Sequence, residues 1–220
     1  MPDNNLELQQ ISKEFPGVKA LDQVSLTVQA GEVHALCGEN GAGKSTLMNI
    51  LSGNLQPNGG SIHWKGQEVQ IPDPIEAQRL GVAIVYQERS LVETLSVAEN
   101  IFIRNKPRNR FGLIDFPQLH RKTQELLEQL GLSDIRPQSL ISSLSTAKQQ
   151  MVEIAKALSQ KPELLILDEP TASITEVETK ILFSIIGRLK EQGVSIIYIS
   201  HRMAEIFEIA DRVSVLKDGQ

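Results

Sequence analysis

One short glycine-rich segment constrains the fold of this chain more than any other feature of its sequence. The segment reads Gly38-Glu39-Asn40-Gly41-Ala42-Gly43-Lys44-Ser45-Thr46. An apolar run of strand length, Val33–Cys37, precedes it, and Leu47, Ile50 and Leu51 follow it at helical spacing. Glycines let backbone N–H groups turn inward around phosphate oxygens, and the positive N-terminal end of the following helix points at the same place. The sequence therefore predicts a strand, a phosphate-binding loop and a helix.

Two side chains at the end of this loop suit a nucleotide. Lys44 is expected to reach the β- and γ-phosphates as a point charge, and the Ser45 hydroxyl to take a position on Mg²⁺. The alternative is a glycine-rich turn without a ligand. The flanking strand and helix disfavour that alternative, because they are the context that the motif requires. The predicted ligand is a nucleotide polyphosphate together with Mg²⁺.

A second apolar run ends in two carboxylates. Leu164–Leu167 has the pattern of a buried strand and is followed by Asp168 and Glu169. Next to a phosphate-binding loop, Asp168 is expected to hold Mg²⁺ through water, and Glu169 to orient the attacking water. Alternatively, the two acidic residues simply begin a surface turn before Pro170. Their position after an apolar strand favours the first interpretation.

The order of elements predicts an α/β fold. A β-rich start with a hairpin of Ser61–Lys65 and Glu68–Ile71 indicates an antiparallel β subdomain. Apolar strands that alternate with helices predict a mainly parallel sheet flanked by helices, the P-loop NTPase core. A helical block interrupts this pattern. We expect one domain over residues 1–220, with 1–95 and 160–220 as core and β subdomain and 96–159 as an inserted α-helical subdomain.

Capping signals mark the helices of the later part of the chain. Ser96-x-x-Glu99 and Thr175-x-x-Glu178 are capping boxes, and Asp115 precedes a proline in the first turn of another predicted helix. The remaining elements that we predict are a helix over 145–159, a helix over 203–210 and strands over 82–86, 195–199 and 212–217.

Composition excludes several classes of protein. The chain of 220 residues has a net charge of −5, whereas a nucleic-acid-binding protein usually carries a basic surplus. A single cysteine, Cys37, gives no disulfide framework and indicates a reducing compartment. The first residues have no basic and apolar pattern of a secretory signal, and no apolar run approaches the ~18 residues of a membrane span.

With these motifs together, the chain resembles the ATP-binding subunit of an ABC transporter. The segments that carry the resemblance are GENGAGKSTL, LLILDEPTAS and YISHR, in the order of that family. The resemblance implies that Gln87 contacts Mg²⁺ and the attacking water, and that His201 contacts the γ-phosphate. It also implies that Phe15 stacks on adenine, although an aromatic residue near a strand end is often part of a core.

Four further segments narrow the resemblance to monosaccharide importers. They are VYQE (85–88), SVAENIF (96–102), QQMVEIAKAL (149–158) and IIYISHRMAEI (196–206). The resemblance implies ATP hydrolysis that powers import of ribose, xylose, galactose or a related solute. It implies a chain with two tandem ATP-binding halves, of which this is the first, and the end at Gln220 is interpreted as that of a fragment.

The same resemblance implies a set of partners. These are a second ATP-binding half or second copy in a nucleotide-sandwich dimer, a transmembrane permease and, indirectly, an extracytoplasmic sugar-binding protein. Nucleic acid is not among them. The expected location is peripheral, on the cytoplasmic face of the inner membrane.

Two departures from the family pattern stand out. The family signature Leu-Ser-Gly-Gly-Gln is Leu144-Ser145-Thr146-Ala147-Lys148 here. This segment is implied to contact the ATP of the partner half. Thr146 and Ala147 add Cβ atoms where the backbone has to approach phosphate, and Lys148 adds a charge. The family D-loop, Ser-Ala-Leu-Asp, is Ala172-Ser173-Ile174-Thr175 here and lacks its aspartate.

These departures motivate a second hypothesis, a regulatory module that dimerises on ATP with little turnover. A third hypothesis, an ABC protein acting on DNA or ribosomes, is disfavoured by the acidic charge balance.

Several other residues are interpreted without a functional role. His34, His63 and His120 are expected at strand or helix surfaces rather than as metal ligands. Cys37 is interpreted as a small buried hydrophobe, with a redox switch as the alternative, and Trp64 as a packing residue. The basic loop Arg104–Arg110 is expected to be solvated, with lipid headgroups or a partner as the alternative.

Overall fold

The computed structural model describes residues 4–87 and 90–220. Glu88, the last residue of the segment VYQE, lies outside the described residues. The chain divides into two compact units. We call them the core unit, with residues up to 84, 162–169 and 186–220, and the helical unit, with residues 85–161 and 170–185.

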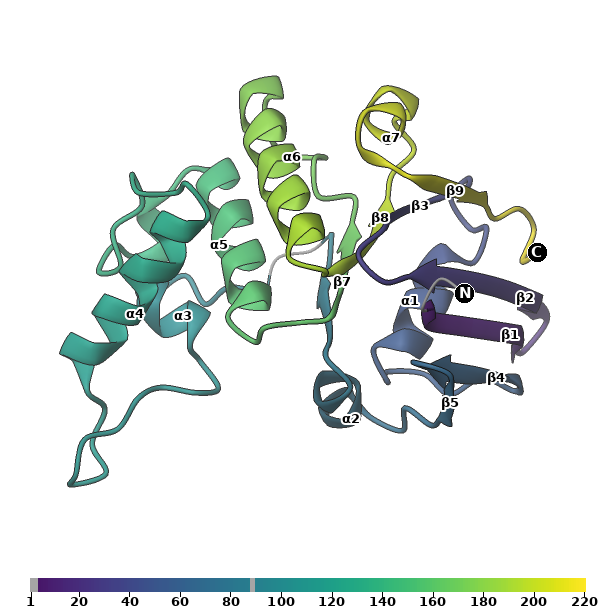
Figure 1. Ribbon diagram of the computed structural model, residues 1–220, viewed down its shortest axis with the longest axis horizontal. Coiled ribbons are helices and arrows are strands. Elements are labelled where there is room, and N and C mark those ends of the chain that lie inside the picture. The colour runs from purple at the N-terminus through teal and green to yellow at the C-terminus, as the bar shows by residue number, and fades with distance from the viewer. Residues whose placement is uncertain (1–3, 88–89) are drawn as a thin grey trace. The chain divides into compact units, whose positions relative to one another are not determined.

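The strands form two sheets (Figure 1). An antiparallel sheet has the order β2-β1-β4-β5, and a five-stranded sheet has the order β6-β7-β8-β3-β9. The strands are β1 (Asn4–Phe15), β2 (Val18–Gln29), β3 (Val33–Cys37), β4 (Gly59–Trp64), β5 (Gln67–Val69), β6 (Val82–Val85), β7 (Leu164–Asp168), β8 (Ser195–Ile199) and β9 (Arg212–Val215). This arrangement confirms the predicted α/β class, with a parallel sheet and a separate antiparallel sheet.

The strand before the phosphate-binding loop lies inside the parallel sheet. β3 pairs in parallel with β8 on one side and with β9 on the other, and β8 pairs in parallel with β7. All five residues of β3 and of β8 are buried, as expected for strands covered on both faces. The carboxyl ends of β3, β7 and β8 therefore meet at one edge of the sheet.

Helices cover both faces of β3 in the core unit. Leu36 packs with Leu47 and Met48 of α1 in the larger hydrophobic core, whereas Ala35 and Cys37 pack with Ile206 of α7 on the other face. The helices of this unit are α1 (Lys44–Leu51), α2 (Pro74–Arg79) and α7 (Met203–Ile209), together with the end of α6 (Glu176–Glu191).

The helical unit contains the predicted helical block and the start of α6. Its other helices are α3 (Val97–Ile101), α4 (Phe116–Gln129), the 3₁₀-helix η1 (Ile141–Ser143) and α5 (Thr146–Leu158). α3 packs against both α4 and α5. The predicted cap residues of these helices are confirmed, since Ser96 forms both bonds of a capping box and Asp115 accepts from the Gln118 N–H. Within the described residues, none of the helices is long and apolar enough to cross a bilayer.

The apolar pattern of the sequence does not predict β1, because the apolar residues of this strand change phase. Leu6 and Leu8 alternate with polar residues, but the next buried residue is Ile11. Between them Gln10 adopts φ 51°, and the register with β2 shifts between Leu8 and Ile11. This bulge adds one residue, so the period-2 pattern breaks in the middle of the strand.

Helix α2 is likewise not predicted from the sequence, although the sequence contains a helix start signal. Asp73 accepts hydrogen bonds from the Ile75 and Glu76 N–H groups at 2.8 and 2.9 Å, and Pro74 stands in the first turn. An Asp-Pro pair followed by an acidic residue is a helix start signal. The helix is only six residues long and was hidden among turn residues.

Candidate functional site

The glycine-rich loop combines positive φ values with close contacts to neighbouring backbone, and glycine suits both conditions. Gly38, Gly41 and Gly43 adopt φ values of 155°, 86° and 105°. A Cβ on Gly38 would stand 2.3 Å from the Leu216 carbonyl oxygen, and one on Gly43 would stand 2.5 Å from the Ala20 carbonyl oxygen. The first and last glycines of the loop are thus required by neighbouring backbone as well as by φ.

Lys44 is the first residue of α1 and lies under the loop. Its ammonium group donates to the carbonyl oxygens of Gly38 and Glu39, at 2.6 and 2.9 Å. Only 8% of the residue is exposed, so the positive charge is held close to the loop backbone. Ser45 and Gly41 are exposed on the same segment. The predicted phosphate contacts, a cation and free loop surface, are therefore brought together in the core unit.

Asp168 ends β7 at the same edge of the sheet. Burial raises the pKa of this carboxyl, and the charge of Glu169 raises it further, while Lys44 acts in the opposite direction. A cation bound beside this carboxyl would favour its ionised form and so offset the cost of burying the negative charge. The Asp168 carboxyl and the Ser45 hydroxyl are hard oxygen donors of the kind that Mg²⁺ prefers, so the donor set fits this ion.

Glu169 and His201 come from neighbouring strands and meet directly. Glu169 follows β7 with φ 45°, and its N–H donates to the Ile199 carbonyl of β8. One carboxylate oxygen lies 3.0 Å from Nδ1 of His201. The His201 side chain is 65% exposed and that of Glu169 only 16%. A carboxylate and an imidazole at this distance form an acid–base pair open to a ligand.

A buried carboxylate that sequence reasoning missed fixes the segment around His201. Glu205 accepts hydrogen bonds from the hydroxyl groups of Tyr198 and Ser200, at 2.8 and 3.3 Å. Arg202 donates to its other oxygen at 3.1 Å, and the Arg202 N–H donates to Ser200 Oγ at 3.0 Å. Residues on both sides of His201 are thus tied to one anchor. Its sequence signal is weak, since a glutamate on a short helix is ordinarily exposed.

The predicted surface position of His34 is wrong. It was expected at a strand surface, but only 1% of it is exposed. Nδ1 lies 3.2 Å from Glu32 Oε1, and Nε2 lies 2.9 Å from Ser214 Oγ. Both ring nitrogens of His34 thus have hydrogen-bond partners, and Glu32 is in turn bound by Arg212, so the imidazole can be buried. Burial lowers the pKa of His34, and Glu32 opposes this shift.

Other residues named by the sequence analysis lie in various places. Phe15 ends β1 and is 40% exposed, with the Lys13 ammonium 5.5 Å from its ring centroid. Gln87 is exposed and belongs to the helical unit. Cys37 and Trp64 are buried, as predicted, and burial raises the pKa of the Cys37 thiol. Among residues 4–87 and 90–220, three or more His, Cys, Asp or Glu side chains nowhere gather as a metal cluster.

The signature segment opens α5 in the helical unit. Ser145 is the N-cap, and its hydroxyl accepts the Lys148 N–H at 3.4 Å. Thr146 is exposed, whereas Ala147 is buried. The Lys148 ammonium pairs with Asp134 at 2.7 Å. The added charge is therefore engaged within its own unit.

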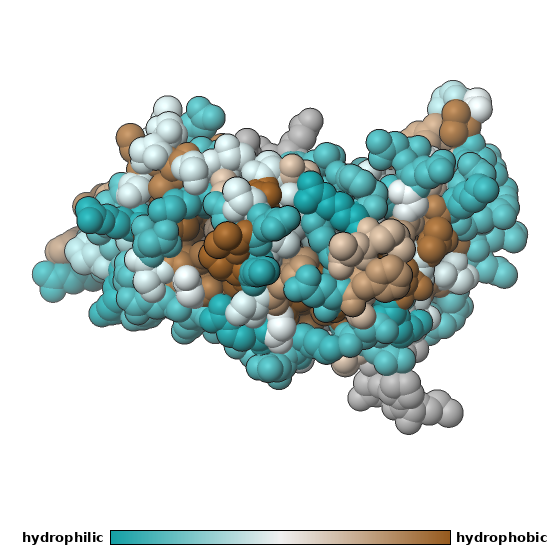
Figure 2. All heavy atoms as spheres, turned by 90° about the horizontal axis from the view of Figure 1, so that it is seen from above, coloured by the Kyte–Doolittle hydropathy of each residue, from teal (hydrophilic) through white to brown (hydrophobic). Residues whose placement is uncertain are grey.

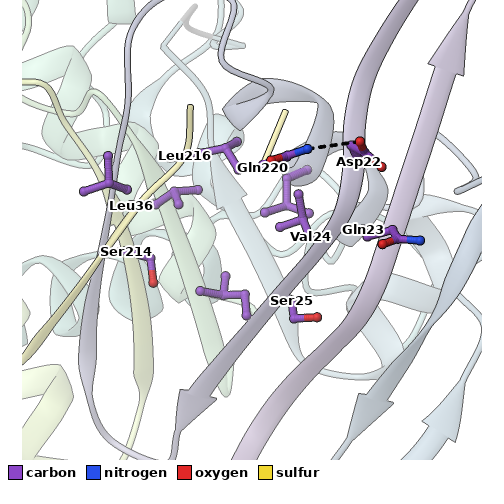
Figure 3. Close-up of a pocket in the computed structure, with 11 residues that line it drawn as sticks. Asp22, Gln23, Val24, Ser25, Leu36, Ser214, Leu216 and Gln220 are labelled. Carbon is purple, nitrogen blue, oxygen red and sulfur yellow. Dashed lines mark hydrogen bonds between the residues drawn. The ribbon is translucent and has the colours of Figure 1, made fainter. Parts of the chain in front are cut away.

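A cavity of about 440 Å³ lies in the core unit, but it contains none of the predicted nucleotide contacts (Figure 3). Val24, Leu36 and Leu216 supply apolar walls, and Gln220 donates to Asp22 across it at 3.1 Å. The chemistry of the site is at the exposed loop and strand ends instead. Backbone N–H groups of a glycine-rich loop can bind phosphate oxygens without a closed pocket.

Comparison with known proteins gives the class that this site indicates. The sequence model of the family described as "ABC transporter" matches residues 21–172. A nucleotide-free ATP-binding cassette from an ABC transporter superimposes with a TM-score of 0.86 at 28% identity, covering 99% of this chain and 89% of that one. A cassette in its ADP conformation gives 0.87 at 27% identity, with the same coverage. The chain belongs to the ABC transporter family.

Two curated relatives carry names that specify a transported sugar. A protein of Agrobacterium fabrum, named as a ribose/galactose/methyl galactoside import ATP-binding protein 1, is 55% identical over 215 residues. A similarly named protein of Hahella chejuensis is 52% identical over 215 residues. In both cases the match covers 98% of this chain and 42% of the relative. The chain thus spans less than half the length of these relatives.

Proposed function

We propose that this chain is the N-terminal ATP-binding half of a monosaccharide importer and hydrolyses Mg-ATP to drive transport. The observation that carries the proposal is the meeting of three features at one sheet edge. These are the glycine loop with Lys44, the Asp168 carboxyl, and the Glu169–His201 pair at 3.0 Å. The names of the relatives, at 55% and 52% identity, support the sugar class of the solute.

The residues divide the chemistry among them. The loop N–H groups and Lys44 bind the phosphates, and Phe15 stacks on the adenine. Ser45 and Asp168 would hold Mg²⁺, with Gln87 as the further ligand that the family resemblance implies, and the ion would neutralise charge on the transferred phosphoryl group. Glu169 accepts the proton of the attacking water, and His201 holds the carboxylate in place and contacts the γ-phosphate. Most of the acceleration then comes from placement and electrostatics.

We further propose that residues 1–220 act as one domain in which 96–159 present the signature to a partner. A second ATP-binding half, or a second copy, completes each nucleotide site in a sandwich dimer. A permease and an extracytoplasmic binding protein select the sugar, and the chain works at the cytoplasmic face of the inner membrane. The capped start of α5 at Ser145 supports the signature role.

The test of the proposal separates binding from turnover. We expect Lys44→Ala to weaken Mg-ATP binding on the order of tenfold to a hundredfold, because charge-assisted hydrogen bonds are lost. Glu169→Gln is expected to keep binding and to lower hydrolysis about 10²–10⁴-fold, the range for a general base. Glu191→Gln, an exposed carboxylate on α6, is the control. Unchanged hydrolysis in Glu169→Gln would contradict the proposal.

The regulatory alternative rests on the altered signature segment. Measuring the ATP hydrolysis rate per chain at several protein concentrations tests it. A hydrolysis rate per chain that rises with protein concentration indicates working dimers. A flat background rate with intact ATP binding favours the regulatory module or an absent partner half. The variant Thr146→Gly, Ala147→Gly, Lys148→Gln then distinguishes the two, since only a defective signature is repaired by it.

A further inference from the structure

Exposed apolar residues concentrate in one short segment of the helical unit. Seventeen large hydrophobic residues are exposed in the described chain, and Figure 2 shows one face on which such patches (brown) lie between hydrophilic residues (teal). Five of the seventeen fall within the fourteen positions 103–116, namely Ile103, Phe111, Leu113, Ile114 and Phe116. Phe111 and Leu113 are the most exposed of the five, at 72% and 67%. Such a concentration on a soluble surface indicates a contact site.

Residues 102–115, which include four of these five side chains, form a folded hairpin that we call the 102–115 loop. It runs between α3 and α4 and extends away from both (Figure 1). Arg108 and Ile114 form an antiparallel bridge, and the Asp115 N–H donates to the Pro107 carbonyl at 2.9 Å. At the tip, Asn109 Oδ1 accepts the N–H groups of Phe111 and Leu113, at 2.9 and 3.2 Å. The exposed side chains are therefore presented by an ordered turn.

The loop is strongly basic in an acidic protein. It carries four cations, Arg104, Lys106, Arg108 and Arg110, and its one acidic residue is Asp115 at the N-cap of α4, whereas the whole chain has a net charge of −5. The Lys106 ammonium lies 3.8 Å from a Glu99 carboxylate oxygen. In the described contacts, Arg108 and Arg110 at the tip pair with no carboxylate. Arg108 donates to the Gly112 carbonyl at 2.9 Å, and the Arg110 guanidinium lies 4.7 Å from the Phe111 ring centroid.

We propose that the 102–115 loop binds the surface of an anionic lipid bilayer, with Phe111 and Leu113 entering the interface and the arginines on headgroup phosphates. An anionic bilayer presents headgroup phosphates at its surface and an apolar layer just beneath them. Arginines beside exposed Phe111 and Leu113 are complementary to both layers. A convex tip fits a fluid bilayer, whereas a protein partner would have to offer a matching acidic hollow. The proposal goes beyond the ATPase function and needs no nucleotide.

The experiment is co-sedimentation of the chain, without nucleotide, with phosphatidylcholine vesicles that contain or lack phosphatidylglycerol. We expect binding to the anionic vesicles only, and a decrease when salt is added. Arg108→Gln with Arg110→Gln is expected to lower the partition coefficient on the order of thirtyfold, from about fivefold per cation near the surface. Phe111→Ser with Leu113→Ser is expected to lower it about tenfold or more.

Matched controls separate the loop from general surface effects. Lys122→Gln with Lys161→Gln removes the same charge from exposed positions outside the loop. Phe207→Ser removes a phenyl ring of similar exposure, 78%, from α7 in the core unit. Both controls should bind vesicles as the parent does, and thermal unfolding should show that all variants are folded. Equal binding to both vesicle types, absence of binding, or an equal loss in the controls would overturn the proposal.

Discussion

At the scale of single residues, the glycine loop offers a matched pair of substitutions. Gly38 and Gly41 both have positive φ, but a Cβ on Gly38 meets the Leu216 carbonyl at 2.3 Å, whereas one on Gly41 meets nothing within 4 Å. Gly41→Ala should therefore cost about 1–2 kcal/mol of backbone strain, and Gly38→Ala clearly more. Urea unfolding of the two variants measures the difference. A smaller loss for Gly38→Ala would show that Leu216 moves aside easily.

The Glu205 anchor leads to a second prediction at this scale. Glu205→Ala removes the hydrogen bond that the buried Tyr198 hydroxyl donates to Glu205, which should cost about 1–3 kcal/mol in the free energy of unfolding. Glu208→Ala, at an exposed position of the same helix, is the control and should change stability little. Glu205→Gln keeps an acceptor for Tyr198 and should recover part of the loss. Denaturant titration of the three variants checks this order.

At the scale of elements, the capping box of α3 sets the strength of one helix start. Ser96 Oγ accepts the Glu99 N–H at 3.2 Å, and the Ser96 N–H donates to Glu99 at 3.1 Å. Ser96→Ala should cost about 1 kcal/mol, the usual value for a lost N-cap. Thermal unfolding of Ser96→Ala and of the exposed control Ser142→Ala measures this. An equal loss in both would mean that the cap contributes nothing.

Local signals of this kind made most elements predictable from the sequence. Buried strands such as Val33–Cys37 and helices with cap residues such as Ser96 and Ser145 carry local signals, and each was predicted within a residue or two. β1 and α2 were not predicted, because a bulge at Gln10 breaks one pattern and turn residues hide the other. Contacts formed through the fold, such as His34 with Ser214, have no local signal.

The candidate site also contains residues that local motifs predict and contacts that only the fold creates. The glycine loop, Lys44, Asp168 and Glu169 form sequence-local motifs, so their roles could be predicted from residue type and spacing. The direct contact of Glu169 with His201 depends on β7 and β8 being neighbours, which no local pattern shows. Glu205 depends on a buried position on a short helix, and was missed for that reason.

At the scale of the whole molecule, the stability of the fold should depend on pH through His34. Burial holds its pKa below the ordinary 6.5, so the unfolded chain takes up the proton first as the pH falls. The contribution of neutral His34 is therefore fully present above 6.5 and is lost as the pH falls towards the lowered pKa of the folded state. His34→Gln, which keeps a donor for Glu32, should flatten this dependence.

Urea titrations at about pH 7.5 and about pH 5.5 check the prediction, because this interval spans the ordinary titration of histidine. The difference in the free energy of unfolding between the two pH values should be smaller in His34→Gln than in the parent. Asp168, with its raised pKa, acts in the opposite direction in both proteins and cancels in the comparison. An unchanged pH dependence would show that His34 does not titrate in this range.

The strand order of the parallel sheet has a consequence for biosynthesis. β3 leads directly into the phosphate-binding loop, yet its neighbours β8 and β9 are Ser195–Ile199 and Arg212–Val215. During translation, the strand that carries the loop is made early and has neither neighbour in the sheet until more than 150 residues later, since 195 minus 37 is 158. Such distant pairing is slow and exposes apolar strands meanwhile. A nascent chain released before β8 would thus carry the complete glycine motif without a sheet to hold it.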